Sequence, residues 1–237
     1  MSSWALVTGA SKGIGAATAV SLAADGHDVL VHYGGDADGA ARTVEACEAQ
    51  GAEARAVGCD LSSETAPLTD AMEEVGGVRA LVNNAGVTAD GLALSMKDEA
   101  FARTWEVNVD AAFKLTRAAL RRMIRARDGR VVMVSSVVGL HGNPGQANYA
   151  ASKAALVGLA KSLAREVGGR GVTVNAVAPG FVETAMTEEL DESLLERIPA
   201  GRLGTPDDVA GAVAFLCSSR AAYVNGTVLQ VDGGLFA

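Results

Sequence analysis

The sequence is poor in the residues that build disulfide frameworks and metal centres. Its three cysteines, Cys47, Cys59 and Cys217, are odd in number, widely spaced and free of any Cys-x-x-Cys motif. Such a set is typical of reduced thiols in a cytosolic protein. The histidines also lack the spacing of metal ligands, so we expect no metal site and place all three at surface or loop positions. They are His27, His32 and His141.

Positive charge and long apolar runs are scarce as well. Against 28 Asp and Glu stand 20 Lys and Arg, which gives a net charge of −8. General nucleic-acid binding needs a basic surface that neutralises phosphates, so the charge argues against that function. No apolar run reaches the roughly 18 residues that span a bilayer, and no secretory signal is visible. We therefore expect a cytoplasmic protein with neither a membrane nor a nucleic acid as its partner.

Apolar residues, in contrast, are abundant: 49% of the 237 residues are hydrophobic and only 20% are charged. This composition is typical of a globular protein with a sizeable core. Short apolar runs alternate with longer alanine-rich helical patterns, which is typical of parallel strands covered by helices. The sequence predicts an α/β fold: a single Rossmann-type, doubly wound domain over 1–237, with a parallel seven-stranded sheet and helices on both faces.

The predicted strands are 4–8, 28–33, 54–59, 80–83, 130–135, 172–176 and 227–231. The predicted helices are 13–25, 37–50, 63–75, 98–127, 148–167 and 206–217, the last capped by Thr205. Segment 183–204 is polar and has no strand partner, so we expect it to be a mobile substrate lid.

Tyr149 and Lys153 are four residues apart in a predicted helix, which places both on one face, roughly 6 Å apart along its axis. Taken alone, such a pair is usually an ordinary surface Tyr and Lys. A phenol has a pKa of about 10, and a neighbouring ammonium favours the phenolate. We therefore expect Lys153 to lower the pKa of Tyr149 towards the range of proton-transfer chemistry.

A glycine-rich turn follows the first predicted strand and opens the first predicted helix. Gly9, Gly13 and Gly15 follow the pattern Gly-x-x-x-Gly-x-Gly. The first glycine permits the tight turn, and the later two let a pyrophosphate approach the helix N-terminus. A purely structural glycine turn is the alternative.

The second predicted strand ends without the acid that usually binds the ribose 2′-hydroxyl of NAD. The first carboxylate after it is Asp36. A 2′-phosphate would meet no repulsion there, and Lys12 would be available to pair with it; the alternative is a solvated loop cation. We expect NADP(H) rather than NAD, with Asp60 near the adenine.

The ordered set of motifs resembles the short-chain dehydrogenase/reductase family over essentially the entire chain. The motifs are the glycine turn, Asn83-Asn84-Ala85-Gly86, Asn108, Ser136, Tyr149 with Lys153, and Pro179-Gly180 followed by Thr184. Each is weak singly, and together they are specific. Stretches 83–90, 135–153, 162–167, 177–184 and 199–202 are most similar to the bacterial 3-oxoacyl-[acyl-carrier-protein] reductases. Acetoacetyl-CoA reductases and polyketide ketoreductases share much of this pattern.

This resemblance implies NADPH-dependent reduction of a 3-oxoacyl thioester in fatty acid or polyketide biosynthesis. Tyr149 would donate the proton, and Ser136 would hydrogen-bond the carbonyl oxygen. Because side chains alternate along a strand, only one of Ser135 and Ser136 can face the site. The family's spacing between serine and tyrosine selects Ser136. Lys153 would bind the nicotinamide ribose, and Asn108 would hold a water. The residues implied to bind the cofactor are Gly9, Ser11, Lys12, Gly13, Ile14, Gly15, Gly34, Asp60, Leu61, Asn84, Gly86, Tyr149, Lys153, Pro179, Gly180, Val182 and Thr184.

Five arginines crowd the end of the long predicted helix: Arg121, Arg122, Arg125, Arg127 and Arg130. Cations favour a helix C-terminus for structural reasons; the functional alternative is docking of an acidic acyl carrier protein. Arg127 and Arg170 match the docking residues of the carrier-protein reductases. The resemblance also implies a homotetramer, with the two long helices and 232–237 at its interfaces.

Two other functions stay open at this point. One is a reductase or dehydrogenase of a small carbonyl or alcohol. The other is a non-catalytic NADP(H) sensor, which the intact Asn108, Ser136, Tyr149 and Lys153 set disfavours.

Overall fold

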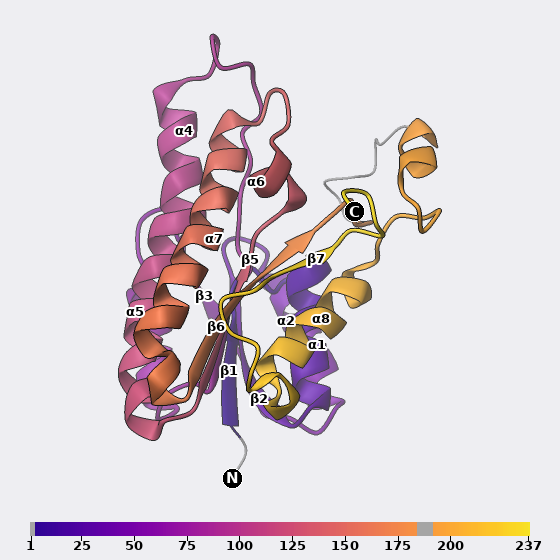
Figure 1. Ribbon diagram of the computed structural model, residues 1–237. Helices are drawn as coiled ribbons and strands as arrows, with labels where there is room; N and C mark the ends of the chain where they lie inside the picture. Colours follow the sequence, from indigo (N-terminus) through magenta and orange to yellow (C-terminus); the bar gives the residue numbers. More distant parts are fainter. Residues whose placement is uncertain (1–2, 184–191) are drawn as a thin grey trace.

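Seven parallel strands form one sheet in the order β3-β2-β1-β4-β5-β6-β7 (Figure 1). The structure, a computed structural model, describes residues 3–183 and 192–237. The chain winds from the middle of the sheet to one edge and then to the other, which confirms the predicted doubly wound fold. The strands are β1 (Ser3–Val7), β2 (His27–Tyr33), β3 (Ala54–Gly58), β4 (Ala80–Asn83), β5 (Gly129–Val134), β6 (Val172–Pro179) and β7 (Val228–Val231).

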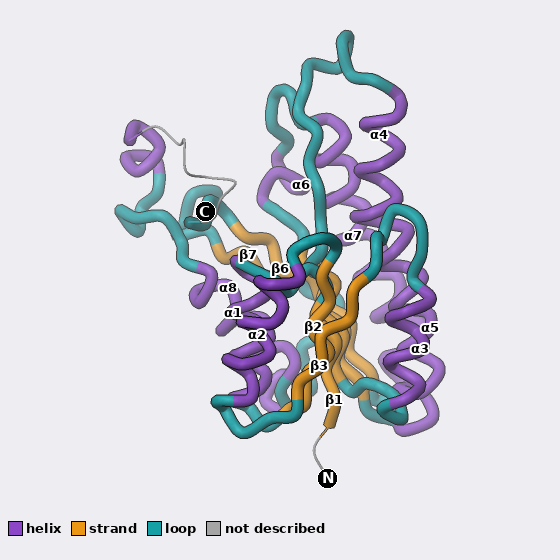
Figure 2. Tube along the Cα trace, turned by 180° about the vertical axis from the view of Figure 1, so that it is seen from behind, coloured by secondary structure: helices purple, strands orange, loops and turns teal. Residues whose placement is uncertain are grey.

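Helices cover both faces of the sheet (Figures 1 and 2). One layer holds α1 (Gly13–Ala24), α2 (Ala37–Glu48) and α8 (Pro206–Cys217). The other holds α3 (Ala66–Glu74), α5 (Ala111–Ala126) and α7 (Ala147–Val167), and α4 (Asp98–Trp105) continues the line of α5 beyond the sheet. The short elements are α6 (Val137–His141), η2 (Gly168–Arg170), η3 (Glu192–Arg197) and η4 (Ser219–Ala221).

The inner strands are buried on both faces because neighbouring side chains enter different cores, whereas the edge strands β3 and β7 are partly exposed. In β1, Leu6 packs in the core under α3, α5 and α7, whereas Val7 packs in the core under α1, α2 and α8. Strands buried in this way read as continuous apolar runs in the sequence. The parallel arrangement also brings the carboxyl ends of all strands to one edge of the sheet, where a doubly wound fold places its ligands.

The prediction of a single helix over 98–127 is wrong. A π-helical segment, η1 (Glu106–Asp110), separates α4 from α5. One extra residue per turn is accommodated there, and such turns occur frequently at functional sites. The apolar periodicity on either side gave no signal of the break. Helix α6 lies in a stretch predicted as loop, because five residues are too few to show a helical repeat.

The predicted cap of the last helix is confirmed. Thr205 Oγ1 accepts a hydrogen bond from Asp208 N at 3.2 Å, and Asp208 Oδ2 accepts one from Thr205 N at 2.7 Å. This reciprocal pair is a capping box. Just before it, the segment predicted as a lid is closed at its base: Glu183 N donates to Gly204 O at 2.8 Å, and Gly204 N donates to Phe181 O at 2.9 Å.

Candidate active site

Three of the predicted catalytic residues meet where β5 ends and α7 begins. Ser136 follows β5 and caps α6, with its Oγ accepting a hydrogen bond from Val138 N at 3.1 Å. Its hydroxyl is also hydrogen-bonded to the phenol of Tyr149. Lys153 Nζ lies 5.5 Å from the centre of the Tyr149 ring. The spacing of four residues therefore does place phenol and ammonium together.

Lys153 is a buried cation. Its side chain is almost wholly excluded from solvent, and Nζ donates to the carbonyl oxygen of Val134 at 2.8 Å. Burial lowers the pKa of Lys153 to about 8. The ammonium is thus held at the end of β5 in an environment that destabilises its charge.

The expected lowering of the Tyr149 pKa is wrong. Burial raises the pKa of Tyr149 above its ordinary value of 10, while the hydrogen bond to Ser136 opposes the rise and the charge of Asp90 adds to it. Desolvation of the phenolate is the largest of these causes and outweighs the hydrogen bond that opposes it. Tyr149 stays protonated near neutral pH, in the form required of a proton donor.

Asn108 lies in η1, and its side chain is fixed by three hydrogen bonds. Its Oδ1 accepts from Val87 N at 2.8 Å, and its Nδ2 donates to Val87 O at 3.0 Å and to Ser152 Oγ at 2.9 Å. Ser152 in turn donates to the carbonyl oxygen of Tyr149 at 2.8 Å. This chain ties the π-helical segment to the first turn of α7.

Gly86 shows how closely the group is packed. A Cβ atom placed on Gly86 would lie 3.1 Å from Lys153 Nζ and 3.4 Å from Asn108 Oδ1. The absence of a side chain there leaves the space in front of both groups open. Asn108 and Lys153 therefore face the same space at the carboxyl end of β4.

The choice between the two serines agrees with their contacts. Ser135 is buried, and its hydroxyl donates to the carbonyl oxygen of Lys153 at 2.7 Å. Ser135 therefore supports α7 from below, whereas Ser136 is bonded to the phenol.

The glycine turn lies beside this group, between β1 and α1. Gly9 and Gly13 have positive φ angles of 63° and 56°, which glycine adopts without strain. A Cβ on Gly15 would lie 2.2 Å from Gly9 O and 2.5 Å from Asn84 Nδ2. The predicted role of Gly15 in admitting a pyrophosphate is therefore not needed to explain it, because the close packing of the turn itself requires glycine.

Asn84 acts on the turn rather than facing outward. Its Nδ2 donates to Thr8 O at 2.8 Å and to Gly9 O at 3.0 Å. The preceding Asn83 is buried and donates to Thr116 Oγ1 of α5 at 2.9 Å, so its side chain has a structural role.

The first carboxylate after the carboxyl end of β2 already has a hydrogen-bond partner. Asp36 caps α2 by accepting from Gly39 N at 2.9 Å, while Lys12 and Gly34 are exposed. Asp60 lies at the end of β3, where hydrogen bonds from the amide and hydroxyl of Ser62 lower its pKa. The neighbouring Leu61 is buried.

The residues after β6 form the last part of the candidate site at the carboxyl ends of the strands. Gly180 N donates to Val231 O at 2.9 Å, and a Cβ on Gly180 would lie 2.8 Å from Asp232 Cα. Val182 is buried and forms a bridge with Gly204. Thr184 lies outside the described residues.

The surface placement of the histidines is wrong for two of them. His27 and His32 are buried in β2, and only His141 is exposed, where it stacks on Phe236 with ring centres 3.9 Å apart. Both buried rings find hydrogen-bond partners on neighbouring strands, which sequence spacing does not reveal. The three cysteines are free and buried.

The two predicted docking arginines lie side by side, but they lie at the amino ends of the strands and not at the carboxyl ends. Arg127 ends α5 with a left-handed backbone (φ 55°), and its guanidinium donates to Gly169 O at 3.3 Å, next to Arg170. Both precede the amino ends of strands, and Tyr149 lies beyond the carboxyl ends. Arg130 is removed from the predicted cluster, because it is buried in β5.

Fold and site together define a class: an α/β protein with a glycine turn of the dinucleotide-binding type and a Ser, Tyr and Lys group beside it. The model of the family described as enoyl-(acyl carrier protein) reductase matches residues 9–236. The chain belongs to the short-chain dehydrogenase/reductase family, and it is therefore a nicotinamide-dependent oxidoreductase.

Several relatives match over their full length, and their printed name is 3-oxoacyl-[acyl-carrier-protein] reductase FabG. The protein of Escherichia coli (strain K12) is 47% identical over 236 residues, which cover 98% of this chain and 96% of the relative. That of Vibrio cholerae is 46% identical over 239 residues, covering 98% and 96%. That of Staphylococcus aureus (strain Mu50) is 42% identical over 243 residues, covering 100% and 99%. The predicted resemblance to bacterial 3-oxoacyl-[acyl-carrier-protein] reductases is confirmed.

No helix among residues 3–183 and 192–237 has the length and apolar character of a membrane span.

Proposed function

We propose that the protein reduces the 3-oxo group of an acyl thioester carried by an acyl carrier protein, with NADPH as the cofactor. The observation that carries this proposal is the hydrogen-bonded Ser136–Tyr149 pair above the Lys153 ammonium, beside a glycine turn. Two hydroxyl groups at one point are suited to bind one carbonyl oxygen. The names of the full-length relatives support this substrate class.

Bound beside these residues, the nicotinamide supplies the hydride. Ser136 and Tyr149 hydrogen-bond the carbonyl oxygen and hold the carbonyl carbon in position for attack. Tyr149 then donates its proton to the developing alkoxide. Its raised pKa keeps this proton in place until negative charge appears on the substrate oxygen.

Lys153 supports this step through its charge. Its Nζ donates to Val134 O and has further N–H groups for the ribose hydroxyls, and its charge stabilises the phenolate that Tyr149 becomes. Asn108 commits its amide to Val87 and Ser152, so its side chain has a positioning role. The water that the resemblance implies would then be held by main-chain groups of η1.

The preference for NADPH rests on the end of β2. Asp36 is engaged as the cap of α2 and is turned to Gly39 N, so it does not select a ribose 2′-hydroxyl. The exposed Lys12 at the N-terminus of α1 is available to a 2′-phosphate.

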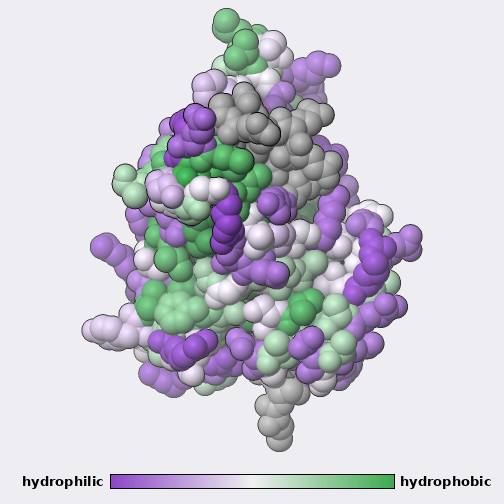
Figure 3. All heavy atoms as spheres, turned by 90° about the vertical axis from the view of Figure 1, so that its right-hand side faces the viewer, coloured by the Kyte–Doolittle hydropathy of each residue, from purple (hydrophilic) through white to green (hydrophobic). Residues whose placement is uncertain are grey.

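An acyl chain needs apolar surface, and the carboxyl edge provides it. Leu140 of α6, Leu195 of η3 and Phe236 each expose 37% of their surface. Figure 3 shows apolar surface on the upper half of this side of the molecule. The predicted lid, 183–204, is hydrogen-bonded at its base through Glu183 and Gly204, and its residues 184–191 lie outside the described residues.

Arg127 and Arg170 are proposed to dock the carrier, and their position has a consequence. They lie about 30 Å from Tyr149, because the 21-residue helix α7 separates Tyr149 from the segment that holds Arg170. A carrier bound there would serve the site of another subunit, which agrees with the proposed homotetramer.

The test is NADPH oxidation with acetoacetyl-carrier protein and acetoacetyl-CoA side by side, with a crotonyl-carrier protein and NADH as controls. We expect preference for the carrier-bound 3-oxo substrate and for NADPH. Faster turnover of the crotonyl thioester would instead support the activity in the family description. Turnover of none of these thioesters by a folded, NADPH-binding protein would overturn the substrate class and favour a small carbonyl.

Two variants separate the parts of the proposal. Lys12→Ala is expected to raise KM for NADPH and leave KM for NADH unchanged; equal effects would remove the cofactor argument. Arg170→Glu is expected to slow the carrier-bound substrate about tenfold and leave acetoacetyl-CoA unaffected.

A further inference from the structure

Near its carboxyl end, strand β2 contains a buried histidine, His32, whose ring contacts the glycine turn. His32 is 2% exposed. Gly9 N donates to His32 Nδ1 at 2.9 Å, and Ala10 N donates to the main-chain oxygen of His32 at 2.7 Å. The first two amide groups of the turn are therefore both held by one residue of the neighbouring strand.

The other nitrogen of the ring binds a third strand. Because Nδ1 accepts a hydrogen bond, Nε2 carries the proton, and it donates to the carbonyl oxygen of Cys59 at 3.1 Å. Burial lowers the pKa of His32, which favours this neutral form. Cys59 directly precedes Asp60 and Leu61, so the ring connects the glycine turn to the segment expected near the adenine.

The turn is held from the opposite side as well. Asn84 Nδ2 donates to Thr8 O and Gly9 O, and a Cβ on Gly9 would lie 2.9 Å from Ala85 Cα. Gly9 is thus fixed between the end of β4 and the ring of His32. Removal of either contact leaves the positive-φ turn supported on one side only.

We propose that His32 is the positioning residue for the adenosine and pyrophosphate half of the cofactor. Its ring fixes the glycine turn through Gly9 and the 59–61 segment through Cys59. Within the described residues the ring has no hydrogen bond to Tyr149 or Lys153, beside which the nicotinamide would bind. This inference rests on the dinucleotide binding of the proposed function, and it adds a residue to which no catalytic or cofactor role was assigned.

Three substitutions separate the two hydrogen bonds. His32→Asn places an amide oxygen where Nδ1 lies and keeps the acceptor for Gly9. His32→Gln places an amide nitrogen where Nε2 lies and keeps the donor to Cys59. His32→Leu removes both.

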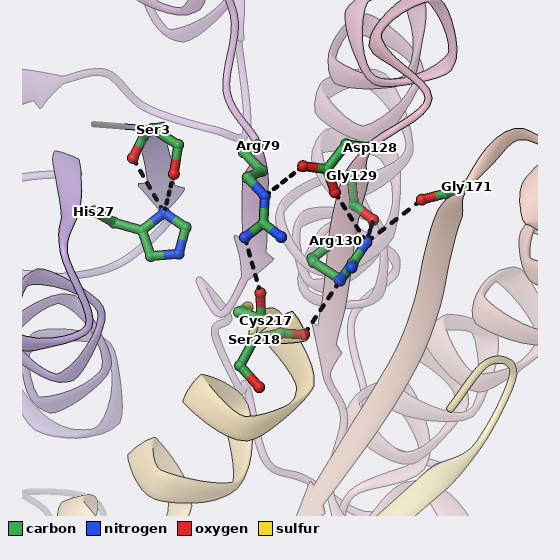
Figure 4. Close-up of polar contacts among 9 residues, drawn as sticks. All are labelled: Ser3, His27, Arg79, Asp128, Gly129, Arg130, Gly171, Cys217 and Ser218. Carbon is green, nitrogen blue, oxygen red and sulfur yellow. Dashed lines mark hydrogen bonds and ion pairs between the residues drawn. The ribbon is translucent and has the colours of Figure 1, made fainter. Parts of the chain in front are cut away.

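His27 offers a matched control. It is the first residue of the same strand, is buried, and pairs through Nδ1 with Ser3 at 3.0 Å (Figure 4). His32 lies near the opposite end of this strand, next to the glycine turn. His27→Leu therefore removes a comparable ring without touching the turn.

The experiment is titration of each variant with NADPH and, separately, with reduced nicotinamide mononucleotide, which lacks the adenosine half. For His32→Leu we expect the NADPH Kd to rise about tenfold, the effect of about one hydrogen bond. His32→Asn should raise it by less than about threefold, and His32→Gln by more than His32→Asn. Binding of the mononucleotide and kcat at saturating NADPH should stay within about twofold of wild type.

Three results would overturn the inference: an unchanged NADPH Kd in His32→Leu, equal Kd values in His32→Asn and His32→Gln, or an equal loss in His27→Leu. If His32→Leu does not fold, the Asn and Gln pair still decides. A wild-type protein that binds neither NADPH nor NADH would instead overturn the proposed function itself.

Discussion

Each edge of the sheet holds one buried cation, and the surroundings of the two differ. At the amino edge Arg130 is 6% exposed, and its guanidinium is surrounded by acceptors (Figure 4). These acceptors are the carboxylate of Asp128 and the carbonyl oxygens of Gly129, Gly171 and Ser218. At the carboxyl edge Lys153 is 3% exposed and, within the described residues, its ammonium donates to one carbonyl oxygen, that of Val134.

The difference separates a structural cation from a reactive one. Burial lowers the pKa of Arg130 too, but four acceptors offset part of its desolvation, and they join β5, the end of α8 and the loop before β6. Lys153 lacks such compensation, so its charge stays costly and its pKa falls to about 8. A buried cation with unused donors at a ligand edge is typical of a functional site.

Substitution of the proposed proton donor should abolish most of the catalytic activity and leave the stability of the fold almost unchanged. Tyr149→Phe is expected to lower kcat by about a thousandfold, since it removes the general acid. The free energy of unfolding should change by less than about 1 kcal/mol, because only one partly buried hydroxyl is lost. Steady-state NADPH oxidation and urea denaturation measure the two effects. A loss of activity below tenfold would contradict the assignment of Tyr149.

The opposite result is expected at the amino edge. Arg130→Met should lower the free energy of unfolding by about 3 kcal/mol, because Asp128 and three carbonyl oxygens lose their donor. The kcat of the folded variant should match wild type at 25 °C. Arg79→Met is the control: Arg79 also pairs with Asp128, at 2.6 Å, but its side chain is 25% exposed, and a loss of about 1 kcal/mol is expected. Equal losses for both arginines would remove the distinction.

Lys153→Met tests whether the buried charge of Lys153 lowers the free energy of unfolding. Activity should be lost, yet the variant should be more stable than wild type at pH 7 by about 1 to 3 kcal/mol, since a costly buried charge is removed. The folded pKa of about 8 lies below the ordinary 10.5, so the unfolded chain binds the proton more tightly. Wild-type stability should therefore rise between pH 8 and 10.5, and the variant should lack this rise.

Urea denaturation across that pH range measures the slope. A wild-type stability that is flat or falls between pH 8 and 10 would show that Lys153 is better compensated than its contacts indicate.

The inner strands were predictable because they are buried on both faces, so β5 stands out as an apolar run rich in valine. The proximity of Tyr149 and Lys153 was predictable because they share a helix and local spacing fixes their relation. What failed depends on contacts between distant segments. The burial that raises the Tyr149 pKa, the internal use of Arg130 and the partners of His32 all come from neighbouring strands and helices. No periodicity in the sequence carries that information.

The π-helical segment η1 places a constraint on the length of the chain. Deleting one residue from Glu106–Asp110 would turn this wide turn into a regular α-helical one, because the extra residue would be gone. Leu115 and Met123 could keep their places in the core, but the side chain of Asn108 would lose its position opposite Val87 and Ser152. Insertions and deletions, which surface loops tolerate, should therefore be rejected in this helical stretch, so alignment gaps among functional homologues are expected to avoid it.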